Sequence, residues 1–359
     1  MWQYILRRLL LAVPVIIGIL IVTFLIARMI PGDPCTAALG ERATRTQCEA
    51  FFRRMGLDQP MYVQLGIYMA DILRGDFGDS IRYHRPVSTF ILERLPVTVE
   101  LGISALSLAV LIGVPAGIIS ALRRNSSIDV ATMVGANIGV SMPVYWLGLM
   151  LAFVFGVLLR DTPFWLAPTG RLTPGLVSVP FYEVWGINLA RGSLLDSLGE
   201  FLSNFLIFNS ILAFRWNILI DAIRHLILPT IALSTIPLAI IARITRSSML
   251  DVLGRDYVRA ARAKGLQERA VVFKHAFRNA LLPVVTVIGI QVGTLFAGAV
   301  LTETTFGFSG VGRALFDAIT GRDYPVIQGF TVVVAVGYVL INLIVDISYA
   351  YIDPRVKLS

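Results

Sequence analysis

The residues best suited to a chemical role lie in one polar stretch, residues 251–283, between two apolar runs in the second half of the chain. From Arg243 to Arg278 there are nine lysines and arginines and three acidic residues, a net charge of +6. A stretch of this kind either lies against lipid headgroups as a solvated basic loop or presents a docking helix to a cytoplasmic partner. Both interpretations stay open until the surrounding elements are known.

Inside this stretch the residue pattern predicts a short helix over residues 256–265. Asp256 is expected to cap its first turn by accepting backbone N–H bonds, and Gly265 to take the left-handed conformation that closes a helix. Ala260 and Ala261 leave the middle slim, so another surface can approach closely. The nine residues before Gly265 make a rod of roughly 13 Å, too short to be stable in water without packing.

The sequence lacks the familiar signatures of catalysis. A P-loop needs a lysine directly after a glycine, and none of Lys264, Lys274 and Lys357 follows one. Neither H-E-x-x-H nor G-x-S-x-G occurs, and the three histidines stand apart. We therefore predict no catalytic residue, no metal site and no cofactor on this chain, and no enzymatic activity.

The composition is that of an integral membrane protein. Of 359 residues 56% are hydrophobic and 15% charged, against about 25% charged in soluble domains. A membrane span needs about 20 apolar residues. Six apolar runs reach this length or come close to it: residues 9–27, 101–122, 130–159, 226–242, 279–302 and 324–345.

The distribution of charge orients these six spans. With a cytoplasmic N-terminus, the inner segments together carry +10 and the outer segments 0, as the positive-inside rule requires. A seventh span at residues 201–214 would move the +6 segment outside, so this short apolar run is predicted to be interfacial or re-entrant. Nucleic acid is excluded as a partner, because the cations follow the cytoplasmic rim without interleaved aromatic residues.

The outer segment of residues 28–94 is long enough for a small subdomain. Helix-like spacing occurs at residues 49–55 and 61–73, and residues 75–80, GDFGDS, read as a loop. Cys35 and Cys48 both lie here, on the oxidising side if the membrane is a bacterial inner membrane. They are either bridged or two free thiols, and we predict the bridge.

The spans themselves contain few charges. Glu100 and Asp346 lie near span ends, where a structural role is favoured over an ion relay. Pro143 is expected to kink the third span, and three glycines to let the fifth pack closely: Gly289, Gly293 and Gly298. Mildly polar residues suit the lining of a conduit with weak binding: Asn137, Ser141, Thr286, Gln291 and Thr294.

Two motifs point to a family. DYVRAARAKGL at residues 256–266 and HAFRNALLPVV at 275–285 resemble the cytoplasmic signature of ABC-importer permeases of the dipeptide/oligopeptide/nickel branch, closest to the dipeptide-permease B-type subunit. MIPGDP at residues 29–34, LTETTFGFSGVGR at 301–313 and RDYPVIQG at 322–329 fit the same branch. Two features depart from the general importer motif: Arg259 stands where its leading glutamate would be, and Leu282-Pro283 comes late.

The resemblance implies an all-α, type I importer permease with six transmembrane helices in a bacterial inner membrane. Its parts would be a transmembrane helix over residues 1–30, an extracytoplasmic subdomain over 31–94, a permease core over 95–353 and a cytoplasmic tail over 354–359. The partners implied are a second homologous permease, two cytoplasmic ATPases that bind ATP and Mg, and an extracytoplasmic binding protein.

Residues 256–265 would then be the coupling helix that seats in an ATPase groove. The coupling residues implied are Asp256, Tyr257, Arg259, Ala260, Ala261, Arg262, Lys264, Gly265 and Leu266. Phe306, Phe308 and Arg313 are expected to form an outer gate or to contact the binding protein. Peptides suit the resemblance best, but nickel chelates, glutathione or haem stay open as solutes, and so does an ATP-independent channel.

Overall fold

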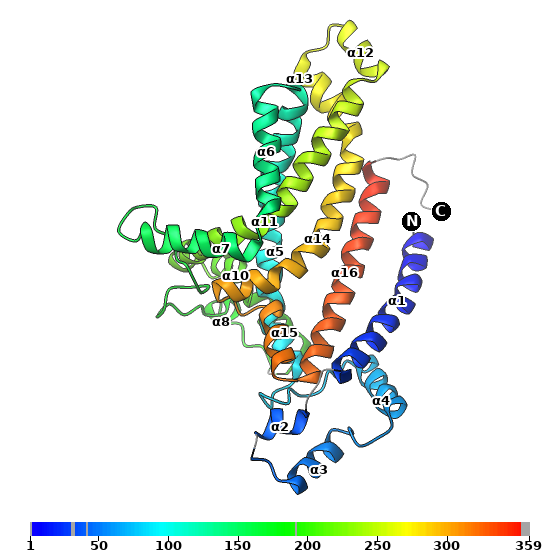
Figure 1. The fold of residues 1–359 in the computed structure, drawn as a ribbon, viewed down its shortest axis with the longest axis vertical. Coiled ribbons are helices and arrows are strands. Elements are labelled where there is room, and N and C mark those ends of the chain that lie inside the picture. The colour runs from blue at the N-terminus through cyan, green and yellow to red at the C-terminus, as the bar shows by residue number, and fades with distance from the viewer. Residues whose placement is uncertain (1, 30–32, 41, 191, 353–359) are drawn as a thin grey trace.

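The computed structural model describes residues 2–29, 33–40, 42–190 and 192–352 (Figure 1). In these residues all regular structure is helical, apart from one isolated β-bridge between Asp79 and Pro86. The predicted all-α fold is therefore confirmed. The predicted tail, residues 354–359, lies outside the described residues.

Five helices are long and apolar enough to cross a membrane, and each matches a predicted span. They are α1 (Trp2–Met29), α5 (Val87–Leu122), α11 (Trp216–Leu253), α14 (Arg278–Phe306) and α16 (Tyr324–Ile352). α11 is the central helix, with contacts to α5 above all and to α14, and Figure 1 shows the long helices running side by side.

The third predicted span is broken. It consists of α6 (Ser127–Ser141), α7 (Val144–Leu151) and the π-helical η1 (Ala152–Leu158), with a bend of 100° between α6 and the rest. The kink expected at Pro143 is confirmed, and it is sharp enough that the third apolar run is two helices, which together make the sixth candidate span if the bent pair crosses as one. Proline disfavours the helical conformation in the residue before it, and Met142 is accordingly extended. α6 runs beside α11, while α7 lies across the direction of α6 and packs against α11 and α14 (Figure 1).

Glycines allow the long helices to approach closely, as predicted for the fifth span. A Cβ at Gly289 would lie 2.6 Å from the side chain of Val345, and one at Gly293 would lie 2.6 Å from Tyr338, both on α16. α5 uses the same device at Gly117, where a Cβ would lie 2.5 Å from a carbonyl oxygen of α11. Larger side chains here would force the helices apart.

Short helices lie at the two ends of the long bundle (Figure 1). The end here called the α12 end holds α12 (Asp256–Ala263), α13 (Glu268–Ala270) and the π-helical η2 (Val271–Phe277). The opposite end, here called the α3 end, holds α2 (Pro34–Leu39), α3 (Arg45–Arg54), α4 (Met61–Leu73) and α15 (Val311–Thr320). The segments predicted as helices at residues 49–55 and 61–73 correspond to α3 and α4, and the GDFGDS stretch is a loop, as expected.

The long connection between η1 and α11 contains α8 (Phe181–Val184), α9 (Leu194–Ser203) and α10 (Leu206–Leu212). Residues 201–214 therefore do not form a span, as predicted. Glu100 of α5 is tied to this connection, because its carboxylate pairs with Arg171 at 2.7 Å and accepts the N–H of Ile207 at 2.7 Å. Asp346 similarly pairs with Arg8 at 3.1 Å. Both carboxylates thus serve in ion pairs between segments.

Candidate partner-docking site

α12 stands at the extreme end of the bundle, after α11 (Figure 1). Its N-cap is Arg255, in extended conformation, and no side chain caps the first turn. The predicted cap by Asp256 is wrong: Asp256 is the first helical residue, and its carboxylate accepts from Arg259 instead. The helix ends at Ala263, and Gly265 has φ +76°, the left-handed conformation expected. The observed helix is therefore two residues shorter than the predicted 256–265.

Two side chains hold α12 against the bundle. Val258 is fully buried and Ala261, three residues on, is 6% exposed; both pack on Val271 of η2. The partly buried Val252 and Leu253 of α11 complete this cluster. Ala261 therefore faces inward, and its prediction as a partner contact is wrong. Val258 was missed, although an apolar residue three positions before an alanine was a signal of a buried face.

The rest of the α12 surface is open. Tyr257, Ala260 and Lys264 follow one another at helical spacing and are all exposed, with the small Ala260 between two longer side chains. Leu266, just beyond Gly265, is also exposed. An apolar and an aromatic side chain in water at the end of a helix form a face that a partner can cover.

The charged groups of α12 pair locally. Arg259 pairs with Asp256, and Arg262 pairs with Glu268 of α13 at 2.7 Å. The hydrogen bond that Arg262 donates to Glu268 raises the pKa of the Arg262 guanidinium. Ion pairs as exposed as these contribute little to stability. Their positions therefore suit recognition by a partner more than folding.

A partly buried ion pair braces the helices beneath α12. Asp129, at the start of α6, accepts from Nε and Nη2 of Arg246 on α11 at 2.6 and 2.7 Å. The same carboxylate accepts from the Ser120 hydroxyl of α5 and from the N–H of Asn125. Three helices are thus joined at one carboxylate. Sequence reasoning missed this cluster because Arg246 lies 117 positions from Asp129 in the chain.

The predicted lining residues fall into two groups. On α6, Asn137 and Ser141 are exposed, and the Asn137 side chain accepts from Arg243 of α11 at 2.9 Å. On α14, Gln291 is buried and accepts a hydrogen bond from Thr294, while Thr286 donates to the carbonyl of Leu282. No described contact joins the two groups, so the structure does not bring them into one site.

The predicted outer gate is largely core. Phe306 and Phe308 are 1% and 2% exposed and pack with Leu101 and Leu228 of α5 and α11. Because both rings are buried, neither is presented to a docked protein in this conformation, while their part in an outer gate stays a prediction. Arg313, on α15, is accessible.

Two buried carboxylates, neither of them predicted as site residues, hold the α3 end together. Glu303 accepts from the Thr98 hydroxyl at 2.6 Å and from the N–H of Arg313 at 3.0 Å, and so caps the start of α15. Asp323 accepts from the Ser80 hydroxyl and from the N–H groups of residues 81 and 82. Each carboxylate joins segments more than 200 residues apart in sequence.

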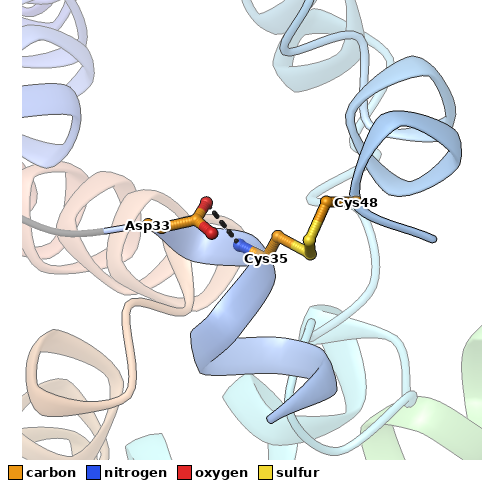
Figure 2. Close-up of side chains that lie close together, drawn as sticks. All are labelled: Asp33, Cys35 and Cys48. Atoms are coloured by element: carbon orange, nitrogen blue, oxygen red, sulfur yellow. Dashed lines mark hydrogen bonds between the residues drawn. A yellow bond between two sulfur atoms is a disulfide. The ribbon is translucent and has the colours of Figure 1, made fainter. Parts of the chain in front are cut away.

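A third connection at this end is a disulfide between Cys35 of α2 and Cys48 of α3 (Figure 2). The Asp33 carboxylate lies near the two sulfurs, and the three side chains together have the composition of a metal-ligand set. The bridged sulfurs are not thiolates, and Asp33 accepts the N–H groups of Cys35 and Thr36 as the N-cap of α2. This cluster therefore has a structural role, as a disulfide and a helix cap.

Comparison with known proteins gives one consistent result. Residues 113–358 match the family described as binding-protein-dependent transport system inner membrane component, and residues 1–102 match its N-terminal counterpart. The dipeptide transport system permease protein DppB of Alkalihalophilus pseudofirmus is 46% identical, covering 99% of this chain and all of that protein. The di/tripeptide permease protein DppB of Pseudomonas aeruginosa is 44% identical, covering 99% of each chain. The oligopeptide permease protein AppB of Bacillus subtilis is 39% identical over 99% of this chain and all of that protein.

Proposed function

The chain belongs to the family of binding-protein-dependent transport system inner membrane components, and on that basis we propose that it is a permease subunit of an ATP-driven peptide importer. It would form half of the translocation pathway with a second, homologous permease. Peptides, of two or more residues, are the solute that the names of its relatives favour. Energy would come from two cytoplasmic ATPases, and the solute from an extracytoplasmic binding protein.

The observation that carries this proposal is the presentation of α12. Its inner face is anchored by Val258 and Ala261, while Tyr257, Ala260 and Lys264 stay in water. A short helix fixed on one side and bare on the other can transmit movement of a bound partner to the long helices behind it. α11 and η2 supply that connection, since both pack directly against α12.

Gly265→Val tests the proposal. At φ +76° a β-branched residue costs about 1–2 kcal/mol and redirects the chain that leaves the helix. We expect normal insertion, loss of peptide uptake and weaker co-purification of the ATPase. Gly254→Ala is the matched control, because Gly254 lies in the same segment with φ −80° and no atom within 3.7 Å of a Cβ. Full uptake by Gly265→Val at normal expression would contradict the proposal.

The proposed orientation puts the α12 end in the cytoplasm and the α3 end outside. Arg124, in the turn before α6, and Arg54, on α3, are both exposed. A cysteine at position 124 should be labelled by a membrane-impermeant reagent only after the membrane is opened, and one at position 54 in intact cells. The reverse pattern would contradict the orientation.

A further inference from the structure

A cleft at the α3 end is lined by arginines from three separate segments. Its volume is about 390 Å³, and it lies between the loop before α5, the start of α5 and α15. Arg82 and Arg85 come from the loop, Arg94 from α5 and Arg313 from α15. Arg82, Arg85 and Arg94 lie close together in the chain, whereas Arg313 is more than 200 positions away, so only the fold brings its guanidinium group to the other three.

Two carboxylates fix the walls of this cleft, and their oxygens already accept hydrogen bonds from the fold. Asp323 holds the backbone of residues 81 and 82, and Glu303 holds the first turn of α15. A Cβ at Gly310, on the cleft wall, would lie 2.3 Å from the Glu303 carboxylate, so the wall is closely packed. The arginines therefore stand on a preformed surface.

The arginines are unequally neutralised. Arg85 pairs with Glu93 at 2.6 Å, and Arg313 has Asp317 at 4.0 Å. Among the described residues no carboxylate lies within ion-pair distance of Arg82 or Arg94. Arg94 partly offsets the charge of buried Glu303 without contacting it, donates to the carbonyl of Ser309 at 3.0 Å, and leaves its buried Nε without a partner.

We propose that this cleft receives an acidic side chain of the extracytoplasmic binding protein when that protein docks. The planar guanidinium presents a fork of N–H donors that matches a carboxylate. The cleft is too small for a folded domain and large enough for a few side chains, so its occupant is a projection from a larger partner. This inference rests on the proposed function, which provides such a partner at this end of the molecule.

The test uses the complete transporter in nanodiscs and its own binding protein, purified and fluorescently labelled. Arg82→Gln combined with Arg313→Gln removes two accessible charges from the cleft. Arg53→Gln combined with Arg54→Gln removes two exposed charges from α3 at the same end and is the matched control. We expect docking to weaken by about tenfold at low salt in the cleft variant, with a smaller salt dependence, and by less than about twofold in the control.

Each outcome decides the matter. Equal docking by the cleft variant and the wild type overturns the inference alone, whereas absence of docking to the wild type overturns the proposed function and the inference with it. Two other sources of an anion are measured in parallel. The first is a dipeptide, whose binding is compared with that of the same dipeptide amidated at its C-terminus; the second is anionic lipid that co-purifies with the transporter. If the cleft variant loses binding of either one while docking of the binding protein is unchanged, the inference is overturned. Thermal midpoints of both variants equal to that of the wild type exclude misfolding as the cause.

Discussion

At the α12 end, Asp256 and Glu268 lie in water beside arginines, whereas at the α3 end Glu303 and Asp323 are buried against hydroxyl and backbone N–H groups. The first two ion pairs join residues three and six positions apart. The second two carboxylates join segments more than 200 positions apart. The charges of Asp256 and Glu268 are therefore available to a partner, while the carboxylates of Glu303 and Asp323 are used to hold the fold.

Under the proposed function, this difference would let the chain offer α12 to a moving ATPase without loss of its own structure. Only a few apolar side chains hold α12. Residues on its exposed face can therefore be replaced with little loss of stability and are accessible to a partner. The α3 end is joined by Glu303, Asp323 and the Cys35–Cys48 disulfide, so its surface is preformed. Four variants sharpen the comparison, and they are given from the largest expected effect to the smallest.

Glu303→Leu should have the largest effect on stability. It leaves the Thr98 hydroxyl and the N–H groups at the start of α15 buried without an acceptor, at a cost of about 3 kcal/mol or more. We expect a lower thermal midpoint of the purified protein and a reduced membrane level. Glu268→Leu, at the α12 end, is the control and should leave both unchanged. Equal midpoints for the two variants would erase the distinction between the ends.

Replacing Cys35 and Cys48 by serine should weaken the α3 end locally. The bridge closes a separation of 13 positions, worth about 3 kcal/mol if its effect is on the unfolded chain. We expect faster proteolysis between α2 and α3, with the long helices intact. Mass analysis of the unreduced wild type comes first and should show no alkylated thiol. Two alkylated cysteines there would contradict the bridge.

Val258→Ser should unseat α12 without unfolding the bundle. It removes a buried apolar side chain and adds a hydroxyl without a partner, at a cost of about 2 kcal/mol that falls on α12 alone. Hydrogen exchange should rise in residues 256–263 and ATPase co-purification should fall. Tyr257→Ala, on the exposed face, should lower co-purification with no change in exchange. If both variants changed exchange equally, the two faces of α12 would not differ as described.

Arg259→Glu should have the smallest effect on stability, because its ion pair with Asp256 lies in water. Reversal of a charge at the proposed interface should nevertheless lower peptide uptake by about fivefold or more. Arg269→Glu, in the neighbouring α13, is the control for a general loss of positive charge. Equal uptake by the two variants would show that the position of the charge on α12 is unimportant.

Much of the architecture was readable from the sequence because its signals are local. Apolar runs of about 20 residues predict spans without knowledge of their neighbours, and the positive-inside rule needs only the charges between them. The left-handed Gly265, the break at Pro143 and the short helix at residues 61–73 all follow from residues adjacent in the chain. The end-to-end family match depends on the same local motifs.

What the sequence did not show is what depends on distant segments. Whether Asp256 caps its helix or pairs with Arg259, and whether Ala261 faces a partner or Val271, is decided by how α12 lies on α11 and η2. Phe306 and Phe308 appear as gate residues in a glycine-rich connection until the fold buries them against α5 and α11. Other features form only when segments up to 243 positions apart meet. They are the pairing of Asp129 with Arg246, the hydrogen bonds of the Glu303 and Asp323 carboxylates, and the arginine cleft. Residue type and spacing determined which helices form, and tertiary packing decided which of their charges are buried and which remain free to bind.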